Sequence, residues 1–386
     1  MVENGGNAAL KKYIHARIES TGGLDFATYM ELCLYHPEHG YYMAARDRIG
    51  KQGDFFTSSS VHSLFGRLLA RQLKQMWDVL GGGAFTIAEQ GAGEGHLALD
   101  ILTAIKEECP QFYARLTYLL VEISPDNRER QQRLLAAHAA QVSWCTFEDV
   151  EALVGCYLSN ELIDAFPAHL LEKRAGTLQE VFVVDRDGEL AEELREVSTP
   201  EIAEHFRRLG VAPVEGNRFE VNLAANHWMT QVARKIARGF VLTIDYGYPA
   251  TELYSPLRSN GTLMCYQRHT SNEEPLLRIG EQDITAHVDF TALQLAGQAA
   301  GLEPLWFGEQ YRFLMSLGFV EALIELQAKT ADEKEARALR LTLKNLIMPD
   351  GGMGETFKVL VQGKGVDNPA LLCQRKLTDL PLPAML

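Results

Sequence analysis

One stretch decides the fold of this chain: Phe85-Thr86-Ile87-Ala88-Glu89-Gln90-Gly91-Ala92-Gly93-Glu94-Gly95. A short apolar run comes first, a glycine-rich turn follows, and a helical pattern over 96–107 comes next. This order is typical of a nucleotide-binding edge in an α/β sheet. Because glycine has no Cβ, the backbone of this turn can bend tightly and lie close to a ligand.

The charge beside the turn indicates which ligand to expect. The glycines are spaced Gly-x-Gly-x-Gly, which departs from the Gly-x-Gly-x-x-Gly of dinucleotide enzymes. Glu89 stands two residues before the first glycine, where a carboxylate would repel a pyrophosphate but suit a cation. We therefore expect S-adenosylmethionine, a sulfonium with an ammonium group, rather than NAD. A nicotinamide-dependent oxidoreductase stays open as an alternative, because it would use the same kind of turn.

Composition narrows the function classes. The chain has 386 residues, 46% of them hydrophobic and 23% charged, which is ordinary for a globular protein of more than one domain. Its net charge of −14 argues against general electrostatic binding to nucleic acid. None of the six cysteines forms a C-x-x-C pair and the histidines are dispersed, so we expect no metal site.

The sequence also bears on location. No apolar run reaches the length of a membrane span, so we expect no membrane-spanning segment. Residues 1–12 lack both the apolar core of a signal peptide and the Arg-rich pattern of a transit segment. On this basis the expected location is cytoplasmic. The oligomeric state is left open.

Strand and helix patterns alternate after residue 83. Strands are predicted at 84–89, 116–122, 141–145 and 155–159, with helices at 96–108 and 126–139, which indicates a parallel, doubly wound sheet. A helix at 222–238 precedes a strand at 240–245, and a helix at 289–300 precedes strands at 302–307 and 357–361. A seventh strand arriving after the sixth fits a methyltransferase sheet whose last strand is antiparallel.

The chain divides into four predicted parts. Residues 1–80 carry helices at 8–20, 26–34 and 61–80 and are expected to form an N-terminal helical lid. Residues 81–167 and 221–364 would form the α/β core. Residues 168–220 contain short alternating runs over turns and are predicted to be an antiparallel insertion. Residues 365–386 are assigned to a C-terminal tail.

Acidic residues follow several predicted strands, where open α/β sheets bind ligands. Glu122 ends the run at 118–121, and a carboxylate there can accept hydrogen bonds from both ribose hydroxyls; the alternative is a solvated strand end. Glu148 and Asp149 follow the third strand near Phe147, where adenine could stack or hydrogen-bond; a helix N-cap is the alternative.

The reaction centre is expected after the fourth strand. Glu161 and Asp164 are three residues apart and could face one direction on a helical turn, so that their carboxylates clamp a planar guanidinium. Asp164 capping a turn is the other interpretation. Asp245 ends the fifth strand, at the ligand side or in a structural turn. His287 could carry a proton, or it could be a satisfied core histidine beside Asp289 as a helix cap.

An ordered set of motifs resembles the MidA-like family, the class I S-adenosylmethionine-dependent methyltransferases related to a mitochondrial complex I assembly factor. The resemblance covers about 29–361. Its motifs are Tyr35-His36-Pro37, Gly40-Tyr41-Tyr42, Gly53-Asp54-Phe55, Thr57-Ser58, Phe65-Gly66, the glycine turn, Val121-Glu122-Ile123-Ser124-Pro125, Ser159-Asn160-Glu161-Leu162, Asp164-Ala165-Phe166-Pro167, Asp245-Tyr246-Gly247, Gly261-Thr262-Leu263 and 283–290.

This resemblance implies S-adenosylmethionine as cofactor and methyl transfer to an arginine of a protein substrate, such as a respiratory-complex subunit or another assembly partner. A non-catalytic assembly chaperone on the same fold is an open alternative. The implied catalytic residues are Asn160, Glu161, Asp164, Asp245 and His287. The implied cofactor-binding residues are Asp54, Thr57, Ser58, Glu89, Gly91, Gly93, Gly95, Glu122, Ile123, Glu148, Asp149 and Asn160.

Two positions depart from the family pattern. The loop at Thr57-Ser58 usually continues with Pro-Glu, but here it continues with Ser59-Ser60. The glycine turn of the family is commonly Gly-Pro-Gly-Arg-Gly or similar, but here it is Gly91-Ala92-Gly93-Glu94-Gly95. The first departure puts the loop's substrate contacts in question, and the second could alter how the amino-acid end of the cofactor is held.

Overall fold

The structure is a computed structural model that describes residues 5–44, 62–329, 333–348 and 353–379. The chain forms two compact units. Unit 1 comprises 1–55, 163–229 and 247–296, and unit 2 comprises 56–162, 230–246 and 297–386. Each unit has a hydrophobic core of its own, and each is described by itself below.

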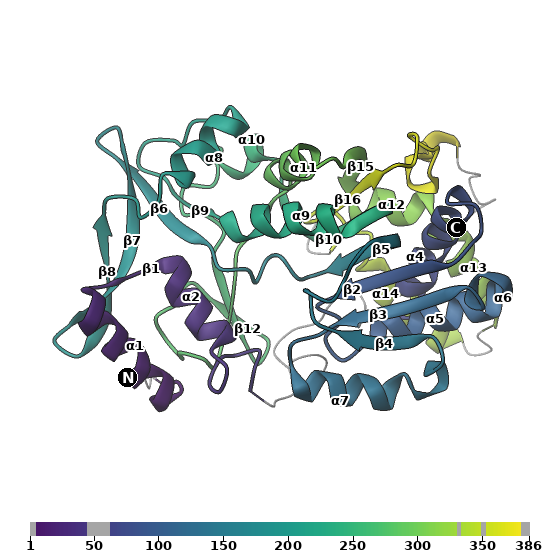
Figure 1. Cartoon of the computed structure of the whole chain (residues 1–386), viewed down its shortest axis with the longest axis horizontal. Coiled ribbons are helices and arrows are strands. Elements are labelled where there is room, and N and C mark those ends of the chain that lie inside the picture. The colour runs from purple at the N-terminus through teal and green to yellow at the C-terminus, as the bar shows by residue number, and fades with distance from the viewer. Residues whose placement is uncertain (1–4, 45–61, 330–332, 349–352, 380–386) are drawn as a thin grey trace. The chain divides into compact units, whose positions relative to one another are not determined.

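Unit 2 is built on the predicted sheet (Figure 1). Its strands are β2 (Phe85–Gln90), β3 (Leu116–Val121), β4 (Val142–Cys145), β5 (Leu153–Asn160), β10 (Ile236–Tyr248), β15 (Glu303–Glu309) and β16 (Phe357–Lys364). They are ordered β4-β3-β2-β5-β10-β16-β15. The first five run parallel, whereas β16 is antiparallel to both β10 and β15. The seven-stranded class I methyltransferase sheet is therefore confirmed.

Helices surround this sheet. They are α4 (Leu64–Val79), α5 (His96–Glu108), α6 (Pro110–Tyr113), α7 (Pro125–Leu134), α12 (Gln310–Ser316), α13 (Phe319–Lys329) and α14 (Glu333–Lys344), while α9 (Leu223–Lys235) and α11 (Phe290–Ala299) each have residues in both units. The helix predicted at 126–139 ends earlier, with a 3-10 turn at Ala136–His138. The strand order reverses between β2 and β5, which marks the expected ligand crevice at their carboxyl ends.

Two predicted boundaries differ in the structure. Helix α4 was assigned to the N-terminal lid, but its buried side chains Phe65 and Leu73 share one core with Ile87 of β2 and Leu158 of β5. The predicted C-terminal tail also joins this core through Cys373, whose backbone N–H donates to the side chain of Gln72 at 3.1 Å. Burial of apolar surface against the sheet decides both assignments.

Unit 1 contains α1 (Ala8–Thr21), α2 (Phe26–Tyr35) and an antiparallel sheet ordered β1-β7-β6-β9, with β8 paired to β7. These strands are β1 (Leu24–Asp25), β6 (His169–Arg174), β7 (Thr177–Arg186), β8 (Glu189–Arg195) and β9 (Arg218–Val221). The antiparallel character predicted for 168–220 is thus observed. Asp25 caps α2, because its carboxylate accepts from the N–H of Thr28 at 2.9 Å.

Residues 247–296 were predicted to belong to the α/β core but form part of unit 1, where Ile284 and Ala286 share a core with Leu10 and Ile14. They include elements that the sequence analysis did not predict. These are α10 (Ala250–Leu253) and the strands β11 (Met264–Gln267), β12 (Thr270–Asn272), β13 (Asp283–Thr285) and β14 (Val288–Asp289); α8 (Glu201–Leu209) was missed as well.

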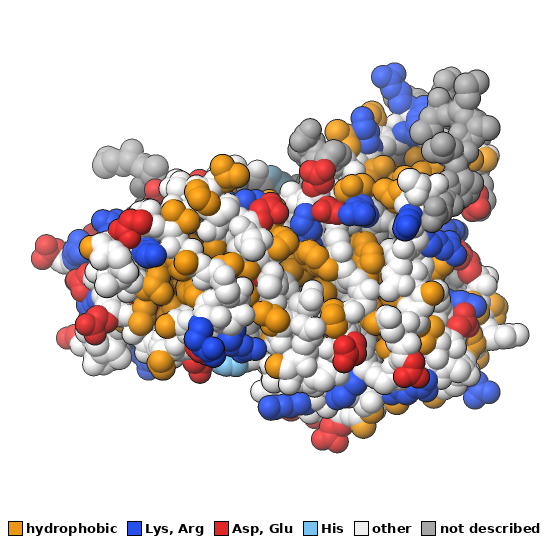
Figure 2. Space-filling model, turned by 90° about the horizontal axis from the view of Figure 1, so that it is seen from above, with side chains coloured by type: hydrophobic (Ala, Val, Ile, Leu, Met, Phe, Trp, Pro, Cys, Tyr) orange, Lys and Arg blue, Asp and Glu red, His pale blue; other side chains and the backbone are white. Residues whose placement is uncertain are grey.

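On the face shown in Figure 2, acidic and basic side chains are interspersed. Within the part of the chain that the structure describes, every helix is too short or too polar to cross a membrane.

Candidate functional site

The glycine turn joins β2 to α5 in a backbone conformation that suits glycine. Gly91, Gly93 and Gly95 have φ values of 76°, 54° and 93°. A Cβ at Gly91 would stand 2.8 Å from Cδ1 of Leu162, which follows β5. The turn is therefore pressed against the segment after β5, and a side chain at 91 would disturb both the turn and its neighbour.

Glu89 lies beneath this turn and is almost fully buried, with 2% exposure. Tyr118 of β3 donates its hydroxyl to a carboxylate oxygen of Glu89 at 2.6 Å. Burial raises the pKa of Glu89 to about 7, the charge of Glu122 adds to that rise, and the Tyr118 hydrogen bond opposes it. The carboxyl expected to attract a cation is thus only partly ionised near neutral pH.

Glu122 follows β3 and is half-buried. Its Oε1 accepts from the N–H of Ser124 at 2.8 Å, and its Oε2 accepts from the side-chain amides of Asn127 at 3.4 Å and Gln131 at 3.0 Å. Burial raises its pKa, and these donors oppose the rise. The next residue, Ile123, is 60% exposed, an unusual exposure for a large apolar side chain. Glu122 and Ile123 thus place a hydrogen-bonded carboxylate next to an exposed apolar side chain.

Gln131 of α7 is a residue that the sequence analysis missed. Its side chain has no exposed surface, although α7 is otherwise polar. Its amide contacts the glycine turn, Glu122 and Trp144. A glutamine in a polar helix is ordinary in sequence, so only the fold reveals this position.

Glu94 is directed toward α7. Its carboxylate lies 3.0 Å from Nη1 of Arg130, whose Nε lies 3.0 Å from Asp126. Arg130 thus lies between two carboxylates, so its single positive charge offsets only part of their negative charge. The effect of Glu94 on the amino-acid end of the cofactor stays a prediction.

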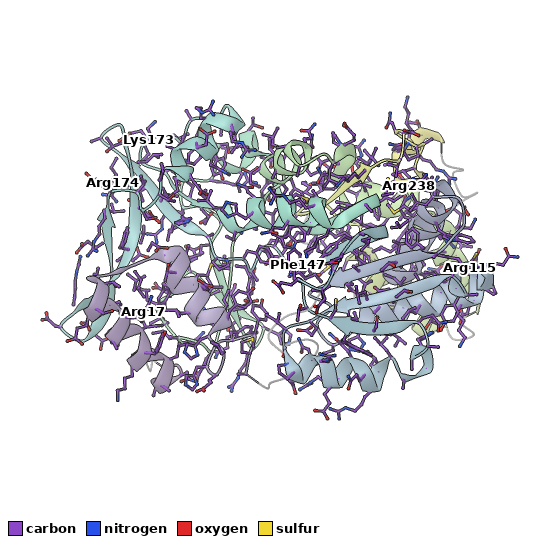
Figure 3. The ribbon with its side chains drawn as sticks, in the orientation of Figure 1. Arg17, Arg115, Phe147, Lys173, Arg174 and Arg238 are labelled. Atoms are coloured by element: carbon purple, nitrogen blue, oxygen red, sulfur yellow. The ribbon has the colours of Figure 1, made fainter. Side chains whose placement is uncertain are left out.

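The segment after β4 lies beside the end of β3, because the N–H of Glu122 donates to the carbonyl of Cys145. Phe147, labelled in Figure 3, is half-buried and contacts Tyr157 of β5 edge-on, with ring centroids 6.3 Å apart. Asp149 accepts from both the N–H and the hydroxyl of Thr146, which lowers its pKa. Asp149 thus holds a turn, while Glu148 is exposed.

The ends of β5 and β10 bring together Asn160, Glu161 and Asp245. Glu161 adopts a positive φ of 52°, and its N–H donates to the carbonyl of Ile244 at 2.9 Å. The amide of Asn160 donates to Glu161 Oε1 at 3.1 Å. Asp245 is fully buried and accepts from the N–H of Leu162 at 3.2 Å. Because Leu162 also abuts Gly91, this group of acceptors borders the glycine turn.

One atom of this group has no partner. Oδ1 of Asn160 is buried without a hydrogen bond from any described residue. A buried acceptor of this kind normally costs stability unless a ligand or water supplies a donor. Its position at the end of β5, one residue before Glu161, marks the crevice as a place where a ligand with N–H or O–H groups fits.

The predicted helical turn that would pair Glu161 with Asp164 is not formed. Residues 161–166 are bends and turns, closed by a bond from the N–H of Phe166 to the carbonyl of Ile163. Glu161 is left-handed, and Pro167 disfavours helix for the residue before it. The prediction of a shared helical face was wrong for this reason, and Asp164 belongs to unit 1.

His287 also lies in unit 1, between β13 and β14. Its ring contacts Tyr248, and its backbone N–H donates to the hydroxyl of Thr262 at 3.0 Å. Burial and the nearby Arg258 lower its pKa to about 4. The imidazole is therefore neutral at physiological pH and a weak base. Asp54, Thr57 and Ser58, predicted to contact the cofactor, lie outside the described residues.

The residues present fit S-adenosylmethionine. The glycine turn offers close backbone approach, Glu122 offers an anchored acceptor for ribose hydroxyls, and Ile123 offers apolar surface for adenine. The buried Oδ1 of Asn160 lacks a donor that such a ligand could supply. One ligand requires all of these groups, and they lie at the carboxyl ends of β2, β3 and β5.

Comparison with known proteins decides the family. The family model described as S-adenosyl-L-methionine-dependent methyltransferase matches residues 68–308, more than half of the chain. The chain belongs to this methyltransferase family. It is an enzyme that uses S-adenosylmethionine, and the match favours this function over both the nicotinamide oxidoreductase and the non-catalytic chaperone.

Individual members of the family are similar over nearly the whole chain. A protein of Burkholderia thailandensis whose crystal structure contains S-adenosyl-homocysteine is 34% identical, with a TM-score of 0.85, covering 95% of this chain and 94% of that one. The Drosophila melanogaster relative named protein arginine methyltransferase NDUFAF7 homolog, mitochondrial, is 29% identical over 94% of this chain and 86% of its own. The Homo sapiens protein arginine methyltransferase NDUFAF7, mitochondrial, is 28% identical over 90% of this chain and 81% of its own.

These names contradict the predicted cytoplasmic location, because both animal relatives of this methyltransferase are mitochondrial proteins. The prediction rested on the composition of residues 1–12 and on the absence of an apolar run long enough to span a membrane, and both are indirect indicators of location.

Proposed function

We propose that this methyltransferase transfers a methyl group to an arginine side chain of a protein substrate. The observation that carries the proposal is the Asn160–Glu161 pair at the end of β5, beside the glycine turn, whereas Asp245 is fully buried and accepts from the N–H groups of Leu162 and Tyr246. A guanidinium is planar and offers five N–H donors, which carboxylates match bidentately. The names of the animal relatives, which specify protein arginine methylation, support the same substrate class.

The chemistry follows from the charges. S-adenosylmethionine supplies a methyl group on a sulfonium, which is electrophilic without further activation. Glu161 would hold the guanidinium and draw its positive charge toward the nitrogens that it binds, leaving another nitrogen richer in electrons. That nitrogen would bond to the methyl carbon as the carbon–sulfur bond of the sulfonium breaks, which leaves the bonding pair on the neutral thioether sulfur. The nitrogen would lose one proton to solvent, so the side chain keeps its single charge. Alignment of this kind can account for about 7–11 kcal/mol of the barrier.

The remaining predicted catalytic residues have different standing in this proposal. Asp164 stays a candidate second acceptor, and its contribution is tested by Asp164→Asn. The lowered pKa of His287 argues against proton transfer by its imidazolium near neutral pH. A respiratory-complex subunit, implied by the family resemblance, is one candidate substrate among proteins with an accessible arginine.

The experiment that tests the proposal identifies the methylated amino acid. The full chain is incubated with methyl-labelled S-adenosylmethionine and a fractionated lysate, and labelled proteins are hydrolysed to amino acids. Label in methylarginine, absent with Glu161→Gln, supports the proposal. Label in methyl-lysine, in another amino acid or in a small molecule contradicts the substrate class, but leaves methyl transfer itself intact.

A further inference from the structure

The side chain of Gln131 joins the glycine turn and Glu122, both of the cofactor site, to Trp144 of β4. Its Nε2 donates to the carbonyl of Gly93 at 2.7 Å and to Oε2 of Glu122 at 3.0 Å. Its Oε1 accepts from the indole N–H of Trp144 at 2.9 Å. The indole nitrogen can only donate, so Trp144 determines which way the amide faces.

Few side chains can replace this amide. A side chain at this position needs one acceptor atom and two N–H groups on a neighbouring nitrogen, and it must be fully buried. A methionine would fill the space but make none of the three bonds. A glutamate would keep the acceptor for Trp144 but lose both donors, and it would bring a carboxylate to about the position now 3.0 Å from Glu122.

The amide acts on two groups that the cofactor needs. It holds the Gly93 carbonyl toward α7, within a turn where a Cβ at Gly95 would lie 3.2 Å from Cγ of Gln131. It also completes the cage of donors that fixes the Glu122 carboxylate. Loss of the amide would release the Gly93 carbonyl and leave Glu122 with only its bonds from Ser124 and Asn127, because one nitrogen serves both groups.

We infer that Gln131 is a positioning residue for S-adenosylmethionine. Its amide fixes the glycine turn and the Glu122 carboxylate relative to each other, without touching the cofactor itself. The ordinary alternative is a buried glutamine that only stabilises unit 2. The two roles differ in what they change: positioning alters affinity for each folded molecule, whereas stabilisation alters the fraction of molecules that fold.

The chain offers a matched control. Gln72 of α4 has no exposed surface, lies in the same unit, accepts from the N–H of Cys373 and donates to Gln75. Gln72→Glu and Gln131→Glu therefore each keep a buried acceptor and lose the donors. Trp144→Phe is a milder variant of the same network, since it leaves Gln131 in place and removes only the bond that orients its amide.

The test measures S-adenosyl-homocysteine affinity by calorimetry and the folded fraction by circular dichroism. We expect Gln131→Glu to weaken affinity about tenfold or more, Trp144→Phe to weaken it about two- to threefold, and Gln72→Glu to leave it unchanged. Should Gln131→Glu not fold, the Trp144→Phe comparison decides. Unchanged affinity in folded Gln131→Glu or in Trp144→Phe, or an equal loss in Gln72→Glu, overturns the inference. Because S-adenosyl-homocysteine binds without a methyl acceptor, the result does not depend on the proposal that arginine is the substrate.

Discussion

The hydroxyl of Tyr118 donates a hydrogen bond of 2.6 Å to the carboxylate of Glu89, and both side chains are buried beneath the glycine turn. Burial raises the pKa of Glu89 to about 7 despite this donor. Since the folded-state pKa exceeds the ordinary value of 4.5, protonation favours the folded state. The contribution of Glu89 to stability is thus greatest at acidic pH and is lost as pH rises from about 4.5 through about 7.

Glu89 should make cofactor binding depend on pH. A bound ammonium favours the ionised carboxylate, so binding should lower the pKa of Glu89 and release a proton. We expect affinity for S-adenosyl-homocysteine to rise up to about tenfold between about pH 6 and about pH 8. Calorimetry in buffers of different ionisation enthalpy measures both the affinity and the proton release. Glu89→Gln should remove the pH dependence, and an identical slope in that variant would contradict this role.

Glu122→Gln should weaken S-adenosyl-homocysteine binding about tenfold or more. The ionised carboxylate can accept charge-assisted bonds from ribose hydroxyls, each contributing on the order of 1.5–3 kcal/mol, and the amide forfeits part of that. Calorimetry again supplies the measurement. Glu151→Gln is the control, because Glu151 is an exposed acid just before β5 that is assigned no part in the cofactor site. Wild-type affinity in Glu122→Gln would argue that the carboxylate only anchors α7.

Gly91→Ala should impair both stability and cofactor binding. The φ of 76° strains any residue with a Cβ by about 1–2 kcal/mol, and Leu162 stands 2.8 Å from the added carbon. Gly81→Ala is a suitable control, since Gly81 has a φ of 95° in the same unit but no atom within 4 Å of a built Cβ. Thermal unfolding should show a larger loss for Gly91→Ala, and only this variant should bind S-adenosyl-homocysteine weakly. Equal losses would mean that the contact with Leu162 is unimportant.

The sequence predicts well what depends on local pattern. Alternating strands and helices indicated the sheet, and the glycine turn indicated its ligand edge, because both signals lie within a few residues. The sequence pattern did not predict contacts between segments that are far apart in the chain. The backbone after Glu161 is set by Asp245, which lies 83 residues from its partner Leu162, so spacing alone wrongly suggested a helical turn.

The sequence also did not reveal which single polar residues are buried. Gln131 finds its partners 9, 13 and 38 residues away, on three different segments, and nothing in its own neighbourhood marks it as buried. The placement of α4 in the core of unit 2 likewise depends on packing against strands later in the chain.

Glu161→Gln separates the chemical step from cofactor binding. The variant keeps the size of the side chain and an acceptor for the Asn160 amide, which now donates to Glu161 at 3.1 Å, but removes the negative charge. We expect S-adenosyl-homocysteine affinity to stay within about twofold of wild type, while kcat for methyl transfer falls on the order of a hundredfold. Single-turnover transfer of labelled methyl to the protein labelled in the lysate measures the second quantity, with Glu151→Gln as the control for loss of an exposed acid. Parallel losses of affinity and kcat would show that Glu161, at its positive φ of 52°, serves the backbone after β5 rather than the guanidinium.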